Sequence, residues 1–260
     1  MDPLHITLAV LCGSLVGLTL GLIGGGGSIM ATPLLLYVVG LPPHVAIGTG
    51  ALSVSANALF NFVGHARCGH VRWRSALIFA AVGTLGALVG STLGKHFDGQ
   101  RLLFLFAVLM VVVGLAMLRA RPASAEGNGA TTLAEELPRV SGAALAVGGL
   151  SGFFGIGGGF LIVPGLLAST RMPMIYAVGS SLLAVATFGF ATALNYAASG
   201  LVDWPVAALY VIGGILGGLV GMRAASALAP HHTAFTRLFA GVIFVVAAYM
   251  LWRTVGAVIA

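Results

Sequence analysis

Two glycine-rich stretches carry the residue types best suited to bind a small anion. Glycine frees the backbone from helical angles and lets another group come close to it. Where such a break leads into a short helix, the first N–H groups of that helix lack partners within it, and its positive dipole end attracts anions. We expect the two stretches to form paired walls of one site, while close helix packing is the competing interpretation of such glycines. The members are Gly24, Gly25, Gly26, Gly27 and Ser28 in the first stretch, and Gly155, Gly157, Gly158 and Gly159 in the second.

Hydroxyl and amide side chains follow each glycine stretch, in the third apolar segment of each series described below. Such groups donate hydrogen bonds to an oxyanion without the desolvation cost of burying a full charge. Hydrogen bonding between helices is the alternative role. In the first copy the polar residues recur every four positions and so share one helix face. We expect the site to be lined by Thr49, Ser53, Asn57, Ser180, Ser181 and Thr187, with a smaller contribution from Asn61, Thr192 and Asn195 near the helix ends.

The sequence lacks the usual signatures of enzyme, metal and nucleotide chemistry. The glycine stretches are not phosphate-binding loops, because the Lys-Ser/Thr pair is missing. Cys12 and Cys68 stand far apart, without metal-ligand spacing. All six acidic residues lie in or beside predicted loops or termini, which disfavours an intramembrane carboxylate site for a cation or metal. We therefore expect no enzyme activity, cofactor, metal or nucleic-acid partner; His44 and His65 are weak candidates for proton handling.

The composition places these residues in a membrane. The chain of 260 residues is 59% hydrophobic and 7% charged, with a mean hydropathy of +1.08. Soluble domains are about 25% charged, and the short alternating segments of an outer-membrane barrel are absent. The start of the chain lacks a basic region and a small-residue cleavage pattern, so we expect the first apolar run to be retained. The composition predicts an all-α, polytopic membrane protein in contact with lipid.

The apolar segments form two copies of one pattern. Residues match at one constant offset along the chain, 131 residues (155 − 24), which we call the repeat offset. At this offset Gly24 matches Gly155, Pro33 matches Pro164, and Val71-x-Trp73 matches Val202-x-Trp204. Matching at one offset is typical of the internal repeats of transporters. We predict a first transmembrane repeat at 1–119, a linker at 120–138 and a second repeat at 139–260. The expected segments are 5–23, 28–40, 45–64, 73–95 and 101–119, then 139–155, 159–170, 175–198, 204–227 and 234–255.

Basic residues indicate how the segments cross the membrane. The second segment of each repeat is too short to span alone, because about 20 residues are needed. If all ten segments nevertheless cross, the repeats are inverted, and only Lys95, Arg101 and Arg253 lie opposite the other nine basic residues. The positive-inside rule favours this arrangement. We predict two inverted five-segment repeats in the inner membrane, with both termini periplasmic and the linker cytoplasmic.

The ordered motifs resemble those of the sulfite exporter TauE/SafE family, and the resemblance covers nearly the whole chain. In the first copy they are Gly21-x-x-Gly24-Gly25-Gly26-Gly27-Ser28, Pro33, Pro42-x-x-x-Ala46-x-Gly48-Thr49 and Gly69-x-Val71-x-Trp73. The second copy supplies Gly152-x-x-Gly155-x-Gly157-Gly158-Gly159, Pro164, Ala177-x-Gly179-Ser180-Ser181 and Gly200-x-Val202-Asp203-Trp204. The resemblance implies an inner-membrane carrier for small sulfur-containing anions such as sulfite, sulfoacetate and other organosulfonates, with export as its best-known direction.

The leading hypothesis is a secondary transporter that exports such an anion by alternating access, and the resemblance suggests coupling to the proton-motive force. Two alternatives stay open: a membrane subunit that assembles a partner complex without transporting, and a carrier that takes organosulfonates up. The sequence leaves the particular anion and a homo-oligomeric state open.

Overall fold

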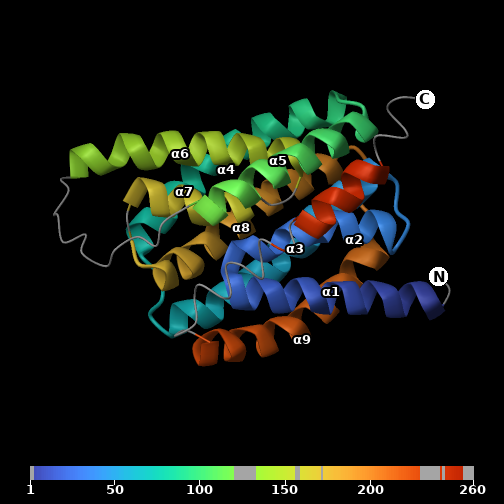
Figure 1. Cartoon of the computed structure of the whole chain (residues 1–260), viewed down its shortest axis with the longest axis horizontal. Helices are drawn as coiled ribbons and strands as arrows, with labels where there is room; N and C mark the ends of the chain where they lie inside the picture. Colours follow the sequence, from blue (N-terminus) through green and yellow to red (C-terminus); the bar gives the residue numbers. More distant parts are fainter. Residues whose placement is uncertain are drawn as a thin grey trace.

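The helices form one bundle with two series of elements. The structure is a computed structural model, and it describes residues 3–119, 133–155, 159–170, 172–228, 241 and 244–253. Within these residues every regular element is a helix, so the all-α prediction is confirmed (Figure 1). The first series is α1 Pro3–Ile23, the 3-10 helix η1 Gly24–Met30, α2 Ala31–Tyr37, α3 Pro43–Arg67, α4 Trp73–His96 and α5 Gly99–Arg119. The second is α6 Leu133–Phe154, α7 Gly159–Thr170, α8 Met174–Ala197 and α9 Trp204–Leu228, followed by the helical segment Phe244–Arg253.

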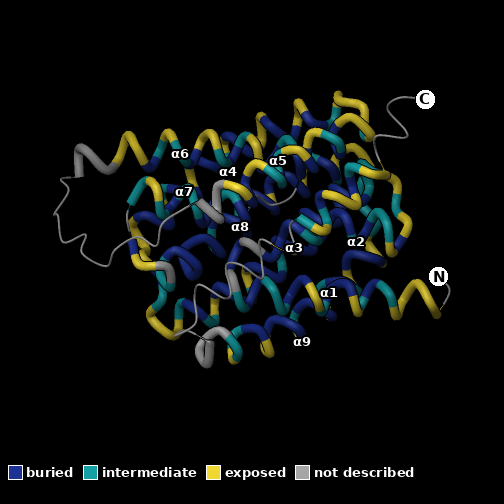
Figure 2. Tube along the Cα trace, viewed as in Figure 1, coloured by how far each residue is buried: buried dark blue, intermediate teal, exposed yellow. Residues whose placement is uncertain are grey.

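The outside of the bundle suits a bilayer. Within the described residues, five helices are long and apolar enough to cross a membrane, namely α1, α3, α4, α8 and α9. Large apolar side chains such as Leu85 and Leu216 are exposed on the outer helix faces, while the centre of the bundle is buried (Figure 2). Exposed apolar surface of this extent is stable against lipid chains and not against water. The chain is therefore a multi-pass membrane protein.

Pairs of helices from different series lie against each other at glycines. A Cβ on Gly17 of α1 would overlap the backbone of Gly214 of α9, and one on Gly148 of α6 would overlap Gly83 of α4. Small residues allow this close approach in membrane bundles. At the repeat offset Gly17 corresponds to Gly148 and Gly83 corresponds to Gly214. The two contacts are therefore equivalent, with the roles of the two series exchanged.

Two expectations about the elements need correction. The first glycine stretch is not an irregular break, because its residues continue as the 3-10 helix η1. Helix α6 begins at Leu133, inside the predicted linker, and continues through Pro138. Proline inside a helix removes one backbone donor, and here the helix extends on both sides of it. The rest of the predicted linker lies outside the described residues, as does most of 234–243.

The first helices of the two series begin at opposite ends of the bundle. Helix α1 begins at the end of the molecule marked N, whereas α6 begins at the opposite end (Figure 1). The short helix α2 follows the first glycine stretch, and the short helix α7 begins at Gly159, the last glycine of the second stretch.

Candidate functional site

The glycine stretches begin with residues in the left-handed conformation. Gly24 has φ +70° and Gly155 has φ +64°, and each directly follows the end of a long helix. Glycine adopts this conformation without the cost that a side chain imposes. A Cβ on Gly24 would overlap Val178 of α8, and one on Gly155 would overlap Ile47 of α3. The first residue of each glycine stretch therefore packs against a long helix of the other series, α8 for Gly24 and α3 for Gly155.

The two stretches meet directly. The backbones of Gly25 and Gly159 contact each other so closely that a Cβ on either would overlap the other. Gly26 lies within η1, and Gly27 packs back onto Thr19 and Leu20 of α1. Gly157 and Gly158 lie outside the described residues. The structure thus brings one predicted wall into contact with the described part of the other.

Ser28 joins the two stretches by hydrogen bonds. The N–H of Gly159 donates to Ser28 Oγ at 3.2 Å, and this hydroxyl donates to the carbonyl of Gly25 at 2.9 Å. Ser28 is fully buried. Its hydroxyl therefore uses both its donor and one acceptor position to hold the two glycine backbones together.

Ser181 plays a similar part from α8. The N–H of Gly25 donates to Ser181 Oγ at 3.2 Å, and the hydroxyl donates to the carbonyl of Val178 at 2.8 Å. The N–H groups that we expected to face an anion are consequently held by serine hydroxyls in this conformation. A hydroxyl oxygen accepts from these N–H groups as an anionic oxygen would.

Thr49 and Ser180 lie away from the glycine contact. Thr49 Oγ1 accepts the N–H of Asp203 at 2.9 Å, and Ser180 Oγ accepts the N–H of Arg72 at 3.0 Å. Asp203 and Arg72 each precede the first residue of a helix, α9 and α4 respectively. At the repeat offset Thr49 corresponds to Ser180 and Arg72 to Asp203, so the two hydrogen bonds are equivalent. Each hydroxyl holds the start of a helix that belongs to the other series.

Ser53 and Asn57 face α9 rather than the glycine stretches. Ser53 Oγ donates to the carbonyl of Thr49 at 2.8 Å and lies 3.5 Å from the carbonyl of Ala207. The amide of Asn57 packs against Gly214. Both side chains are fully buried. The polar face of α3 was expected from the sequence, but the structure places it along the contact with α9.

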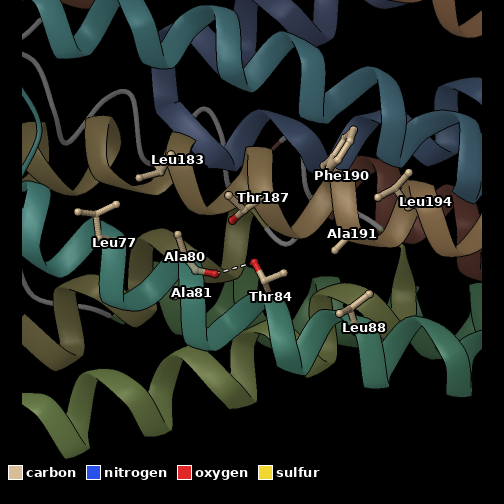
Figure 3. Close-up of a pocket in the computed structure, with 10 residues that line it drawn as sticks. All are labelled: Leu77, Ala80, Ala81, Thr84, Leu88, Leu183, Thr187, Phe190, Ala191 and Leu194. Atoms are coloured by element: carbon tan, nitrogen blue, oxygen red, sulfur yellow. Dashed lines mark hydrogen bonds between the residues drawn. The ribbon is translucent and has the colours of Figure 1, made fainter.

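Thr187 lies in a groove on the side of the bundle. The groove has a volume of about 570 Å³ and is lined by α4 and α8 (Figure 3). Thr187 Oγ1 donates to the carbonyl of Ala184 at 3.1 Å, and Thr84 Oγ1 donates to the carbonyl of Ala80 at 2.6 Å. Both hydroxyls are thus engaged within their own helices. The other side chains on the groove, including Leu77, are apolar, so it suits a lipid chain better than an anion.

One polar cluster was missed at the sequence level. Lys95 Nζ donates to the side-chain oxygen of Asn195 at 2.7 Å, to its carbonyl at 3.1 Å and to Ser199 Oγ at 2.9 Å. The Asn195 amide donates in turn to Ser91 Oγ at 2.7 Å. The cluster ties the end of α4 to the end of α8. Its only signal in the sequence is a lysine at the end of an apolar segment, because its partners lie far away along the chain.

A resident metal site was not expected, and the described residues contain no group of three His, Cys, Asp or Glu side chains that could hold one. Their buried polar side chains are Ser, Thr, Asn and His. Such an interior offers hydrogen bonds without a fixed negative charge.

Comparison with known proteins identifies relatives of the chain. The chain is 54% identical over 249 residues, 95% of each chain, to a probable membrane transporter protein of Xylella fastidiosa strain 9a5c. It is 27% identical to the probable membrane transporter protein YunE of Bacillus subtilis strain 168, over 84% of this chain and 88% of that protein. No solved structure matched the chain. The profile of the family described as sulfite exporter TauE/SafE matches residues 9–250, and the chain therefore belongs to this family of membrane transporters.

Proposed function

We propose that this transporter carries a small sulfur-containing anion, sulfite or an organosulfonate, out of the cytoplasm across the inner membrane. The observation that carries the proposal is the contact of two glycine stretches whose N–H groups are held by the hydroxyls of Ser28 and Ser181. An oxyanion accepts hydrogen bonds more strongly than a hydroxyl does. The name of the family supports sulfite as the first anion to test.

The substrate takes the place of the serine oxygens. On binding, each hydroxyl turns from its carbonyl partner toward the anion, and the N–H groups of Gly25 and Gly159 donate to the anion directly. Since the buried polar residues described here include no carboxylate, no fixed negative charge opposes the entry of the anion.

Access to this site alternates between the two sides of the membrane. The reciprocal contacts at Gly17 and Gly148, and the opposite directions of α1 and α6 (Figure 1), support a pair of inverted repeats. In such transporters one half rocks against the other around a central site. We further propose that the proton-motive force drives export, and that both termini are periplasmic.

Flux into proteoliposomes tests the substrate. We expect sulfite or a small organosulfonate such as sulfoacetate to be transported and to bind the purified protein, while acetate, a small anion without sulfur, is transported much more slowly. If no sulfur-containing anion binds or moves, the proposed substrate class is wrong. Net movement only toward the cytoplasmic face would make the protein an uptake carrier instead.

Serine variants test the site. Ser28→Ala and Ser181→Ala each remove one hydrogen bond from a hydroxyl to the bound anion. We expect affinity for the transported anion to fall by about tenfold or more, the usual loss for one hydrogen bond to a charged group. Ser169→Ala is the matched control, because Ser169 Oγ donates only within α7, to the carbonyls of Gly165 and Leu166. If Ser28→Ala and Ser181→Ala bind the anion as tightly as Ser169→Ala does, neither serine belongs to the anion site.

A further inference from the structure

A row of buried polar side chains runs along α3 on the side that contacts α9 and α1. Its members follow one another every four residues and are at most 5% exposed: Thr49, Ser53, Asn57, Asn61 and His65. A helical row of this length covers about 24 Å, most of the thickness of the hydrocarbon core. Polar groups at this depth are costly and usually functional.

The middle of the row is poorly satisfied. Neither amide atom of Asn57 has a hydrogen-bond partner among the described residues, and the same holds for Asn61 Oδ1, His65 Nδ1 and the hydroxyl of Tyr210 on α9. An unsatisfied buried polar group costs about 1–3 kcal/mol, so a cluster of them requires an explanation. Folding alone does not supply one.

The repeat-related helix contact, α4 with α8, shows that the fold does not need these groups. At the repeat offset, Asn57 corresponds to Phe188 and Tyr210 to Phe79. The rings of Phe79 and Phe188 stack with centroids 6.2 Å apart. A Cβ on Gly83 would overlap Phe188, as a Cβ on Gly214 would overlap Asn57. The contact of α4 with α8 thus has apolar residues at the two positions where the repeat-related contact of α3 with α9 has polar ones.

The chemistry of the unpaired atoms identifies what they bind. An anion requires donors, yet the side-chain oxygens of Asn57 and Asn61 are acceptors. A metal cation usually requires a carboxylate or several oxygen ligands held together, and the row contains no carboxylate. Groups that both donate and accept match water molecules, which need two to four polar partners in a protein interior.

We propose that the contact of α3 with α9 and α1 is a water-lined proton path, with Asn57 and Tyr210 holding water at its middle and His65 at its end. This inference rests on the proton coupling suggested above and assigns its route. Each water passes on one proton as it receives another, so no other reactant is consumed. The repeat-related contact of α4 with α8, at Phe79 and Phe188, stays dry.

The groups around His65 fit the end of such a path. The Nε2 atom of His65 lies 3.4 Å from the carbonyl oxygen of Gly21. Gly21 belongs to the last turn of α1, and this turn carries no titratable residue. The ring of His70 lies with its centroid 5.9 Å away. Two arginines lie close to His65 along the chain or across the helix contact. Arg67 follows His65 on α3. Arg223 lies on α9 next to Met222, whose side chain packs against Gly64 of α3. Near Tyr210, the neighbouring titratable group is Cys12 of α1.

The double variant Asn57→Phe/Tyr210→Phe copies the apolar pair of the repeat-related contact and tests the route. We expect it to fold and to unfold at an equal or higher temperature, because it removes unsatisfied polar groups. In proteoliposomes it should retain exchange of sulfite for sulfite, which needs no net proton movement. Accumulation driven by a pH gradient, with the membrane potential clamped, should fall at least tenfold.

The outcomes separate this inference from the proposed function. If the wild-type protein exchanges no sulfur-containing anion, the proposed function fails. If the double variant accumulates substrate as the wild type does, the proton path is wrong. Phe188→Leu is the control in the apolar pair, and we expect it to leave gradient-driven accumulation unchanged.

A second measurement does not depend on transport. Hydroxyl radicals generated by X-rays from bound water oxidise the side chains beside that water. We expect Tyr210 to be oxidised several-fold faster than its counterpart Phe79, although both are fully buried, and the double variant to lose oxidation at this position. Equal slow oxidation of Tyr210 and Phe79 in the wild type would overturn the inference.

Discussion

Gly25 and Gly159 touch through their backbones, and this contact leaves no room for a side chain. We expect Gly159→Ala to force the two stretches apart, to cost about 1–3 kcal/mol of stability, as overpacking does, and to abolish transport. Thermal unfolding and flux measurements check both effects. Gly142→Ala is the control, because a Cβ there meets nothing within 4 Å and alanine favours a helix over glycine.

Thr187 gives the opposite prediction. Its hydroxyl is engaged within α8 and its side chain lies on the apolar groove between α4 and α8. Thr187→Val keeps the shape of the side chain and removes the hydroxyl. Because this hydroxyl bonds within α8 and lies on the groove, we expect anion affinity and flux to stay within about twofold. The lost hydrogen bond lowers the stability of the protein by roughly 1 kcal/mol or less. A larger loss of affinity, measured by binding, would return Thr187 to the site.

Single residues were only partly predictable from the sequence. The glycine stretches and the polar face of α3 follow from residue types and spacing, which are local. The partners of Ser181 and Thr49 could not be predicted, because both lie on the other half of the chain. Spacing places a hydroxyl on a helix face, whereas packing decides which backbone N–H that hydroxyl meets.

Helices α4 and α8 are tied together at one end by Lys95. Its ammonium donates three hydrogen bonds to Asn195 and Ser199. Lys95→Met removes these hydrogen bonds and leaves two oxygens of Asn195 without this donor. We therefore expect the free energy of unfolding to fall by about 1–3 kcal/mol. A lower midpoint of thermal unfolding checks the prediction. Arg101→Met is the control on the exposed side of α5, where we expect no change; an equal midpoint for both variants would contradict a role for Lys95.

The elements themselves were predicted well, with instructive exceptions. Long apolar runs identify the long helices, because every backbone group in lipid must be bonded within its own segment. The glycine stretch forms a 3-10 helix because neighbouring helices and Ser181 support it, and the sequence contains no sign of that support. The start of α6 was missed because polar residues of its first turns are typical of a linker as well as of a helix.

The orientation of the whole molecule in the membrane stays a prediction, and a native thiol tests it. Cys68 is exposed at the end of α3, whereas Cys12 is buried in the bundle. We predict that the loop at Cys68 is cytoplasmic. A membrane-impermeant maleimide should therefore label the protein in inside-out vesicles and not in intact spheroplasts, and Cys68→Ser should abolish the labelling. Labelling of intact spheroplasts would reverse the assigned orientation.

The reciprocal contacts between the halves have a consequence for the ancestry of the chain. A contact that each half makes in return with the other is the contact of a symmetric dimer. Such an organisation is the one expected if two copies of one subunit were joined into a single chain. Once joined, the two copies no longer had to carry the same residue at equivalent positions. Polar residues such as Asn57 and Tyr210 could then arise at one contact between the copies, α3 with α9, while Phe188 and Phe79 kept the repeat-related contact of α4 with α8 apolar.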